Sequence, residues 1–260
     1  METYTIIIFL VTGLGGGLLG GLLGIGGGMV LMPVMQFVLG YPPQVAVGTT
    51  MLAVVFTAAS GTWQHWKLGN VDWKMVIWIA PAGVLGVLAG SALFHFIKSD
   101  TGLVNLILGI ILLLASCQMV YEGVRRNGPE PVCREMGGGH GTRLGLGAGA
   151  GILAGISGLG GGAILLPGFT FLCGASMRLA IGTSMASFLW YALAGAGLKI
   201  FDGVTDIPAG LIMGIATAVG AIGGARIVPH VPGALLKLLF GVVFIYISIK
   251  YIVSYFGMTI

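Results

Sequence analysis

Two glycine-rich stretches contain the residues best suited to bind a ligand. GLLGIGGGMVLMP at 21–33 and GISGLGGGAILLP at 155–167 place glycines inside otherwise apolar runs. Glycine breaks a helix, and a helix that restarts after the break has free backbone N–H groups at its first turn. Those donors and the helix dipole favour an anion. We expect these glycines to line a substrate site: Gly26, Gly27, Gly28, Gly160, Gly161 and Gly162.

Two hydroxyl-bearing motifs could complete the site. VGTTM at 47–51 and IGTSM at 181–185 place paired hydroxyls on apolar segments. Hydroxyls can hydrogen-bond an oxyanion without a counter-charge, but they can also donate to carbonyls one turn earlier in their own helix. The predicted substrate-binding hydroxyls are those of Thr49, Thr50, Thr183 and Ser184.

Glycines can also allow helices to pack closely. Gly13, Gly17 and Gly21 are spaced by four, which is the small-xxx-small pattern of helix contacts in membranes. We assign these three to packing and leave both roles open for the glycines of 26–28 and 160–162.

The composition predicts a multi-pass membrane protein. Of 260 residues, 57% are hydrophobic and 8% are charged, and no charge occurs between Glu2 and Lys67. Apolar runs of this length are typical of membrane spans. No Asp or Glu lies within a predicted span, which argues against cation transport. No nucleophile–base–acid constellation is discernible, which argues against an enzyme. The scattered cysteines indicate no metal site and no cofactor, and no basic run suggests nucleic acid.

Turn residues and charges divide the chain into an all-α architecture of about eight transmembrane helices. The expected elements are 4–23, 28–40, 44–64, 73–96, 101–121, 143–157, 162–174, 177–198, 207–227 and 233–256. A polar linker at 123–143 separates a first four-helix repeat (1–122) from a second (144–260). Each half has an early helix broken by glycines. Whether 28–40 and 162–174 are re-entrant stays open.

The two halves resemble each other at positions whose numbers differ by 134, such as 24 and 158. GIGGGMVLMP aligns with GLGGGAILLP, and AVGTTM with AIGTSM. Pro33 with Pro167 and Asp72 with Asp206 are matches that glycine abundance does not explain. Duplicated halves with broken segments at matching positions are typical of transporters. Four crossings in each half would give the halves one orientation.

The distribution of Lys and Arg predicts orientation. Over eight crossings, the larger share falls on the side of the central loop and of both termini, which places these in the cytoplasm. Arg226 and Lys199 end predicted spans and are expected at the membrane interface.

The ordered, duplicated motifs resemble the sulfite exporter TauE/SafE family. GGLLGIGGGMVLMP with VAVGTTM, and GISGLGGGAILLP with LAIGTSM, carry the likeness, together with LGNVDW at 68–73. The resemblance implies an inner-membrane transporter of sulfur-containing oxyanions such as sulfite or organosulfonates.

These inferences predict a secondary transporter, with export expected, of a small sulfur-containing oxyanion. It would work by alternating access around a midplane site between the two broken helices. Its expected partners are this anion and the lipid bilayer, and self-association stays open. Three alternatives remain: a passive anion channel, a membrane component that supports a partner enzyme, and a carrier for a neutral or cationic solute.

Overall fold

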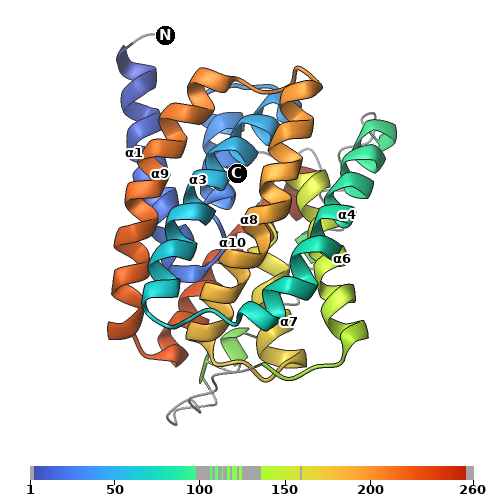
Figure 1. Cartoon of the computed structure of the whole chain (residues 1–260). Coiled ribbons are helices and arrows are strands. Elements are labelled where there is room, and N and C mark those ends of the chain that lie inside the picture. The colour runs from blue at the N-terminus through green and yellow to red at the C-terminus, as the bar shows by residue number, and fades with distance from the viewer. Residues whose placement is uncertain are drawn as a thin grey trace.

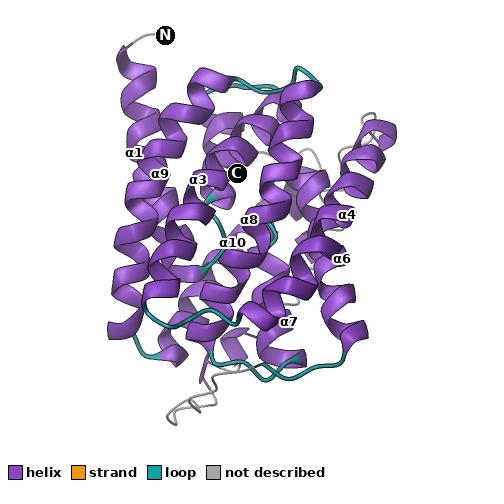
Figure 2. Cartoon of the chain, in the orientation of Figure 1, coloured by secondary structure: helices purple, strands orange, loops and turns teal. Residues whose placement is uncertain are grey.

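A computed structural model describes residues 3–97, 136–158 and 160–255, and single residues between 106 and 124. The described part is helical, and its helices pack side by side (Figures 1 and 2). The α-helices are α1 Thr3–Leu23, α2 Gly28–Pro33, α3 Pro43–Lys67, α4 Trp73–Ile97, α6 His140–Ser157, α7 Gly162–Leu172, α8 Met177–Phe201, α9 Ile207–Ile227 and α10 Gly233–Tyr255. A π-helical turn, η1 Val34–Val38, continues α2, and a 3₁₀ turn, η2 Val228–His230, follows α9.

Six of the helices in the described ranges are long and apolar enough to cross a membrane: α1, α3, α4, α8, α9 and α10. The chain is therefore a multi-pass membrane protein. The eight expected spans are not all found: α6, which corresponds to the expected span 143–157, is not among these six, and the predicted span 101–121 lies largely outside the described residues. The predicted linker 123–143 also lies mostly outside them, and α6 already begins at His140.

Glycines bring α1 close to α9. A methyl group added at Gly17 would overlap the backbone of Thr217, and one added at Gly21 would overlap that of Ala221. Gly13 lies in the same way against Met213. The partner's number rises with the glycine's number, so α1 and α9 are parallel. The packing role expected for these three glycines is confirmed.

A second pair, α4 and α6, is built in the same way. A side chain at Gly151 would overlap the carbonyl of Gly83, and one at Gly155 would overlap that of Val87. The numbers again rise together, so α4 and α6 are parallel. Small residues allow two backbones to approach this closely in a membrane protein.

Helices α3 and α8 cross at the centre and are antiparallel. The Met51 side chain fills the space beside Gly195 on α8, and the Met185 side chain fills the space beside Gly61 on α3. Near the start of α3, Gly48 lies against the carbonyl of Val204, which follows α8. The methionine of each GT[TS]M motif therefore packs on a glycine of the opposite central helix.

The first broken segment returns to the end of the bundle where it began. The ring of Phe9, in the first half of α1, lies 6.5 Å from that of Tyr41, which follows η1. The second broken segment does the same at the other end. The backbone N–H of Gly137, before α6, donates to the carbonyl of Cys173, after α7, at 3.0 Å. Each segment is thus a helical hairpin, and the two enter from opposite ends (Figure 1).

These directions correct the predicted orientation. The start of α1 and residues 136–139 lie at opposite ends of the bundle (Figure 1), so they cannot share the cytoplasmic side. Helices α3 and α8 occupy corresponding positions in the two halves. Because they are antiparallel, the two halves do not share one orientation. The prediction was wrong because it counted each broken segment as a crossing, whereas its two arms lead back to one end.

The close contact of α1 with α9 makes Gly17 sensitive to added volume. We expect Gly17→Ala to lower stability by about 1–3 kcal/mol, because the added methyl group meets backbone atoms that cannot move aside cheaply. Gly15→Ala is the matched control, since nothing lies within 4 Å of a methyl group there. Thermal unfolding of both purified variants measures the difference. Equal melting temperatures would contradict this account of the contact.

Candidate functional site

Both glycine breaks need backbone conformations that favour glycine. Gly24, Gly26 and Gly27 have φ values of 69°, 81° and 75°, and Gly158 and Gly160 have 66° and 81°. L-residues with a side chain rarely adopt these angles. The breaks predicted from the sequence are therefore present in both segments, directly before α2 and α7.

The two breaks meet at the centre of the molecule. A methyl group at Gly162 would overlap the carbonyl of Gly24, and one at Gly160 would lie 3.2 Å from the carbonyl oxygen of Ile25. Gly26 lies against the ring of Phe188 and the side chain of Val54, which are central residues of α8 and α3. The two sets of glycines therefore lie close together in the structure, as expected.

The helix that follows the second break begins against the first break. In α7, the N–H groups of Ile164 and Leu165 donate to the carbonyl of Gly161 at 3.2 and 3.1 Å. The N–H groups at the very start of a helix have no partner within that helix, and they carry the positive end of its dipole. Helix α7 has 11 residues, so its first turn at Gly162 presents a developed N-terminus to the centre.

Thr49 and Thr183 hold elements together at opposite ends of the bundle. The Thr49 hydroxyl accepts a hydrogen bond from the backbone N–H of Asp206 at 2.9 Å. The Thr183 hydroxyl accepts one from the N–H of Asp72, also at 2.9 Å. Each threonine therefore anchors the residue before a helix of the other half, and the two hydroxyls do not converge on the glycine breaks.

Those two aspartates cap helices. The Asp206 carboxylate accepts from the N–H of Ala209 at 3.0 Å, and Asp72 accepts from that of Met75 at 3.2 Å. The second oxygen of Asp206 accepts from the Tyr41 hydroxyl at 2.9 Å. Burial, followed by this hydrogen bond and the nearby negative charge, raises the pKa of Tyr41 to about 12. Tyr41 is therefore a neutral donor at physiological pH.

Thr50 and Ser184 donate to carbonyls of their own helices. Thr50 donates to Ala46 at 2.7 Å, and Ser184 donates to Ile181 at 2.8 Å. Ser184 also contacts the carbonyl oxygen of Gly24 at 2.9 Å, so one motif hydroxyl reaches a glycine break of the other half. Substrate binding by the four hydroxyls stays a prediction, because all four have backbone partners in this conformation.

Three buried polar groups were missed in the sequence or placed elsewhere. Lys199 is 2% exposed and lies inside the protein rather than at its surface, whereas Arg226 is exposed as expected. His65 is fully buried, with Nε2 2.9 Å from the carbonyl oxygen of Gly21. Tyr191 is also fully buried. His65 and Lys199 occupy positions whose numbers differ by 134. A polar residue at the same position in both halves was the signal in the sequence that could have identified them.

The described part of the chain contains no group of three or more His, Cys, Asp or Glu residues that could hold a metal ion. The centre contains instead two broken helices, backbone donors and apolar side chains from α3 and α8. A crossed pair of broken hairpins in a membrane bundle defines a class, the integral membrane transporters.

Comparison with known proteins identifies the particular group within that class. A family profile for the sulfite exporter TauE/SafE matches residues 9–251, and the chain belongs to this family. It is 26% identical to the probable membrane transporter protein YdhB of Bacillus subtilis over 85% of this chain and 89% of that protein. It is a transporter and not an enzyme.

Other relatives match over shorter stretches. The probable membrane transporter protein YunE of Bacillus subtilis is 36% identical over 42% of this chain and 39% of YunE. The sulfite exporter TauE/SafE family protein 6 of Arabidopsis thaliana is 34% identical over 42% of this chain and 26% of that protein. The chain thus matches less than half the length of these two relatives. No solved structure matches it.

An experiment can distinguish a structural role of the Thr49 hydroxyl, which accepts from Asp206, from a role in substrate binding. We expect Thr49→Val to lower stability by about 1–3 kcal/mol, because the N–H of Asp206 loses its acceptor. Thr49→Ser keeps the hydroxyl and is the matched control. Thermal unfolding without ligand measures the effect. An unchanged melting temperature with a weakened anion affinity would contradict the anchoring role and support the substrate role predicted from the sequence.

Proposed function

We propose that this protein is a secondary transporter, and specifically an exporter, of a small sulfur-containing oxyanion such as sulfite or an organosulfonate. The observation that carries the proposal is the meeting of the two glycine breaks between α3 and α8, with the first turn of α7 facing the meeting point. Backbone away from regular helix is tolerated inside a membrane protein where it is buried or lines a cavity. The family's description, sulfite exporter, supports the choice of substrate class.

The site would consist of the two breaks, Gly26–Gly28 and Gly160–Gly162, with substrate held by backbone N–H groups. The four motif hydroxyls would join it only in a conformation in which their present hydrogen bonds are exchanged. Neutral donors suit an anion that must be released again after crossing. Inner-membrane placement follows from the proposed role.

The mechanism would be alternating access between two inverted repeats. Contacts recur at positions whose numbers differ by 134: Met51 on Gly195 matches Met185 on Gly61, and Thr49 with Asp206 matches Thr183 with Asp72. Because the matched elements run in opposite directions, the axis that relates them would lie in the membrane plane. If each half adopted the other's conformation, the site would open to the other side.

Transport in proteoliposomes tests the function. We expect saturable sulfite flux that is accelerated by sulfite on the opposite side, because a carrier returns faster when loaded. Sulfate, thiosulfate and a two-carbon sulfonate define selectivity, and a pH gradient tests coupling. Empty liposomes are the control. Large single-channel currents without acceleration from the opposite side would instead indicate a channel.

A deletion separates transport from support of a partner enzyme. Removing residues 126–134 stops short of Met136, whose N–H donates to the Asp72 carboxylate at 2.8 Å. Flux retained by this variant agrees with a self-contained transporter. Flux lost by a normally inserted variant would favour the docking alternative for the central loop.

The corrected helix directions give a new proposal for orientation. Six basic residues lie at the end of the bundle where α6 begins: Lys67, Lys74, Arg143, Arg178, Arg226 and Lys237. Of the described residues, Lys199 and Lys250 are the basic residues toward the opposite end. The positive-inside rule therefore places residues 136–139 in the cytoplasm and the start of α1 outside.

Labelling of single cysteines tests this orientation. In a variant without its native cysteines, we expect Gly139→Cys to react with an impermeant maleimide only after cells are opened. Thr3→Cys should react in intact cells, because it begins α1 at the opposite end. Both variants are labelled after solubilisation to control for reactivity. The reverse pattern would overturn the proposed orientation.

A further inference from the structure

Tyr191 has a hydroxyl group without a visible structural function. It lies in the middle of α8, its side chain is completely buried, and its hydroxyl oxygen has no hydrogen-bond partner among the residues that the structure describes. Buried tyrosines usually pair this group, because an unpaired polar atom in an apolar interior is costly. Packing in this conformation does not explain the unpaired hydroxyl.

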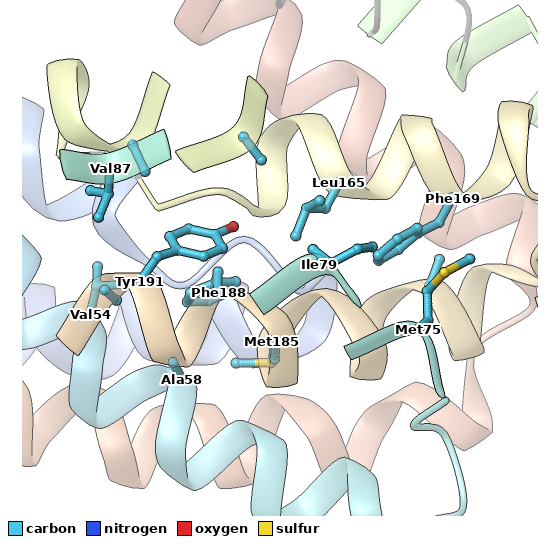
Figure 3. Packing of buried hydrophobic residues seen from close by; sticks show 14 of the residues in the cluster. Val54, Ala58, Met75, Ile79, Val87, Leu165, Phe169, Met185, Phe188 and Tyr191 are labelled. Atoms are coloured by element: carbon cyan, nitrogen blue, oxygen red, sulfur yellow. The ribbon is translucent and has the colours of Figure 1, made fainter. Parts of the chain in front are cut away.

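The hydroxyl points at the second glycine break. A methyl group at Gly161 would occupy the place of the Tyr191 hydroxyl oxygen. Gly161 has a φ of −83°, which any residue adopts, so space and not backbone conformation calls for glycine there. Figure 3 shows the oxygen directed toward the loop that leads into α7. The hydroxyl thus lies beside the first turn of that helix.

Apolar side chains surround the ring of Tyr191. The cluster of buried hydrophobic side chains that contains Tyr191 includes Val54, Val87, Leu165 and Phe188 (Figure 3). The Phe188 and Tyr191 ring centroids are 6.3 Å apart. In such a medium, a hydrogen bond from a neutral donor to an anion is stronger than in water. The donors at this place are the phenol and the N–H groups of α7.

The two halves differ at this position. Thr57 occupies the position of α3 that corresponds to Tyr191 by the difference of 134, and its hydroxyl donates to the carbonyl of Ala53 at 3.3 Å. The threonine is satisfied within its own helix, whereas the tyrosine is not. The unpaired donor therefore belongs to the α7 side of the centre.

We propose that the Tyr191 hydroxyl binds the transported oxyanion together with the first N–H groups of α7. This inference rests on the proposed transport function and assigns its substrate contact to a residue outside the glycine and hydroxyl motifs. The phenol donates a hydrogen bond to one oxygen of the anion, while the backbone N–H groups of the helix donate to the others. Tyr191 is then a determinant of substrate affinity.

Tyr191→Phe tests the assignment because it removes only the hydroxyl. We expect the sulfite concentration for half-maximal flux, and for half-maximal thermal stabilisation, to rise about tenfold or more, as for a lost hydrogen bond to a charged group. Without sulfite, the variant should melt at or above the wild-type temperature, because an unpaired buried group is gone. Tyr251→Phe is the matched control, since the Tyr251 hydroxyl lies 3.5 Å from the Met32 sulfur, in a contact with another helix.

A second variant changes the same site at the residue that precedes α7. Gly161→Ala places a methyl group where the Tyr191 hydroxyl lies, and it should weaken sulfite binding as well. Gly149→Ala on α6, with nothing within 4 Å, is its control. Wild-type sulfite affinity in folded Tyr191→Phe would overturn the proposal while the transport function stands. A wild-type protein without any sulfite flux or stabilisation would overturn the proposed function, and this inference with it.

Discussion

The structure depends on satisfying backbone groups where two helices are broken inside an apolar bundle. Each break frees N–H and carbonyl groups that water cannot reach in the bilayer. Part of the solution comes from the opposite half: Ser184 on α8 contacts the carbonyl of Gly24, and the start of α7 packs on Gly24 and Ile25. The two breaks therefore support each other.

The same constraint explains why so much of the chain is glycine. The hairpins α1–α2 and α6–α7 reach the centre only because α9 and α4 allow backbone-to-backbone contact along their length. In the membrane, helices gain little from hiding apolar surface and more from close packing. Glycines along α1 and α6 supply that packing, while those at the breaks supply turns and space. Glycine thus serves both helix packing and the turns of the breaks. The spacing of glycines in the sequence distinguishes these two roles only in part.

The sequence predicted the helical class, the two breaks and their matching positions, because glycine, proline and apolar patterning are local signals. It did not predict that α3 and α8 are antiparallel, since direction depends on whether a broken segment crosses or returns. The hydroxyl motifs were visible, but the hydrogen bonds of Thr49 and Thr183 join residues far apart in the chain. Tyr191 escaped notice because an isolated aromatic residue in a span is ordinarily a packing residue, and only its unpaired hydroxyl distinguishes it.

On the proposed mechanism, holding the anion by neutral donors has a functional consequence. A buried lysine or arginine would bind an oxyanion tightly, and after release it would remain as an unpaired charge in an apolar interior, at a high cost. A phenol and backbone N–H groups leave only neutral groups behind when the anion departs. The empty carrier can then change conformation without carrying a net charge through the centre, which is what a return step in alternating access requires.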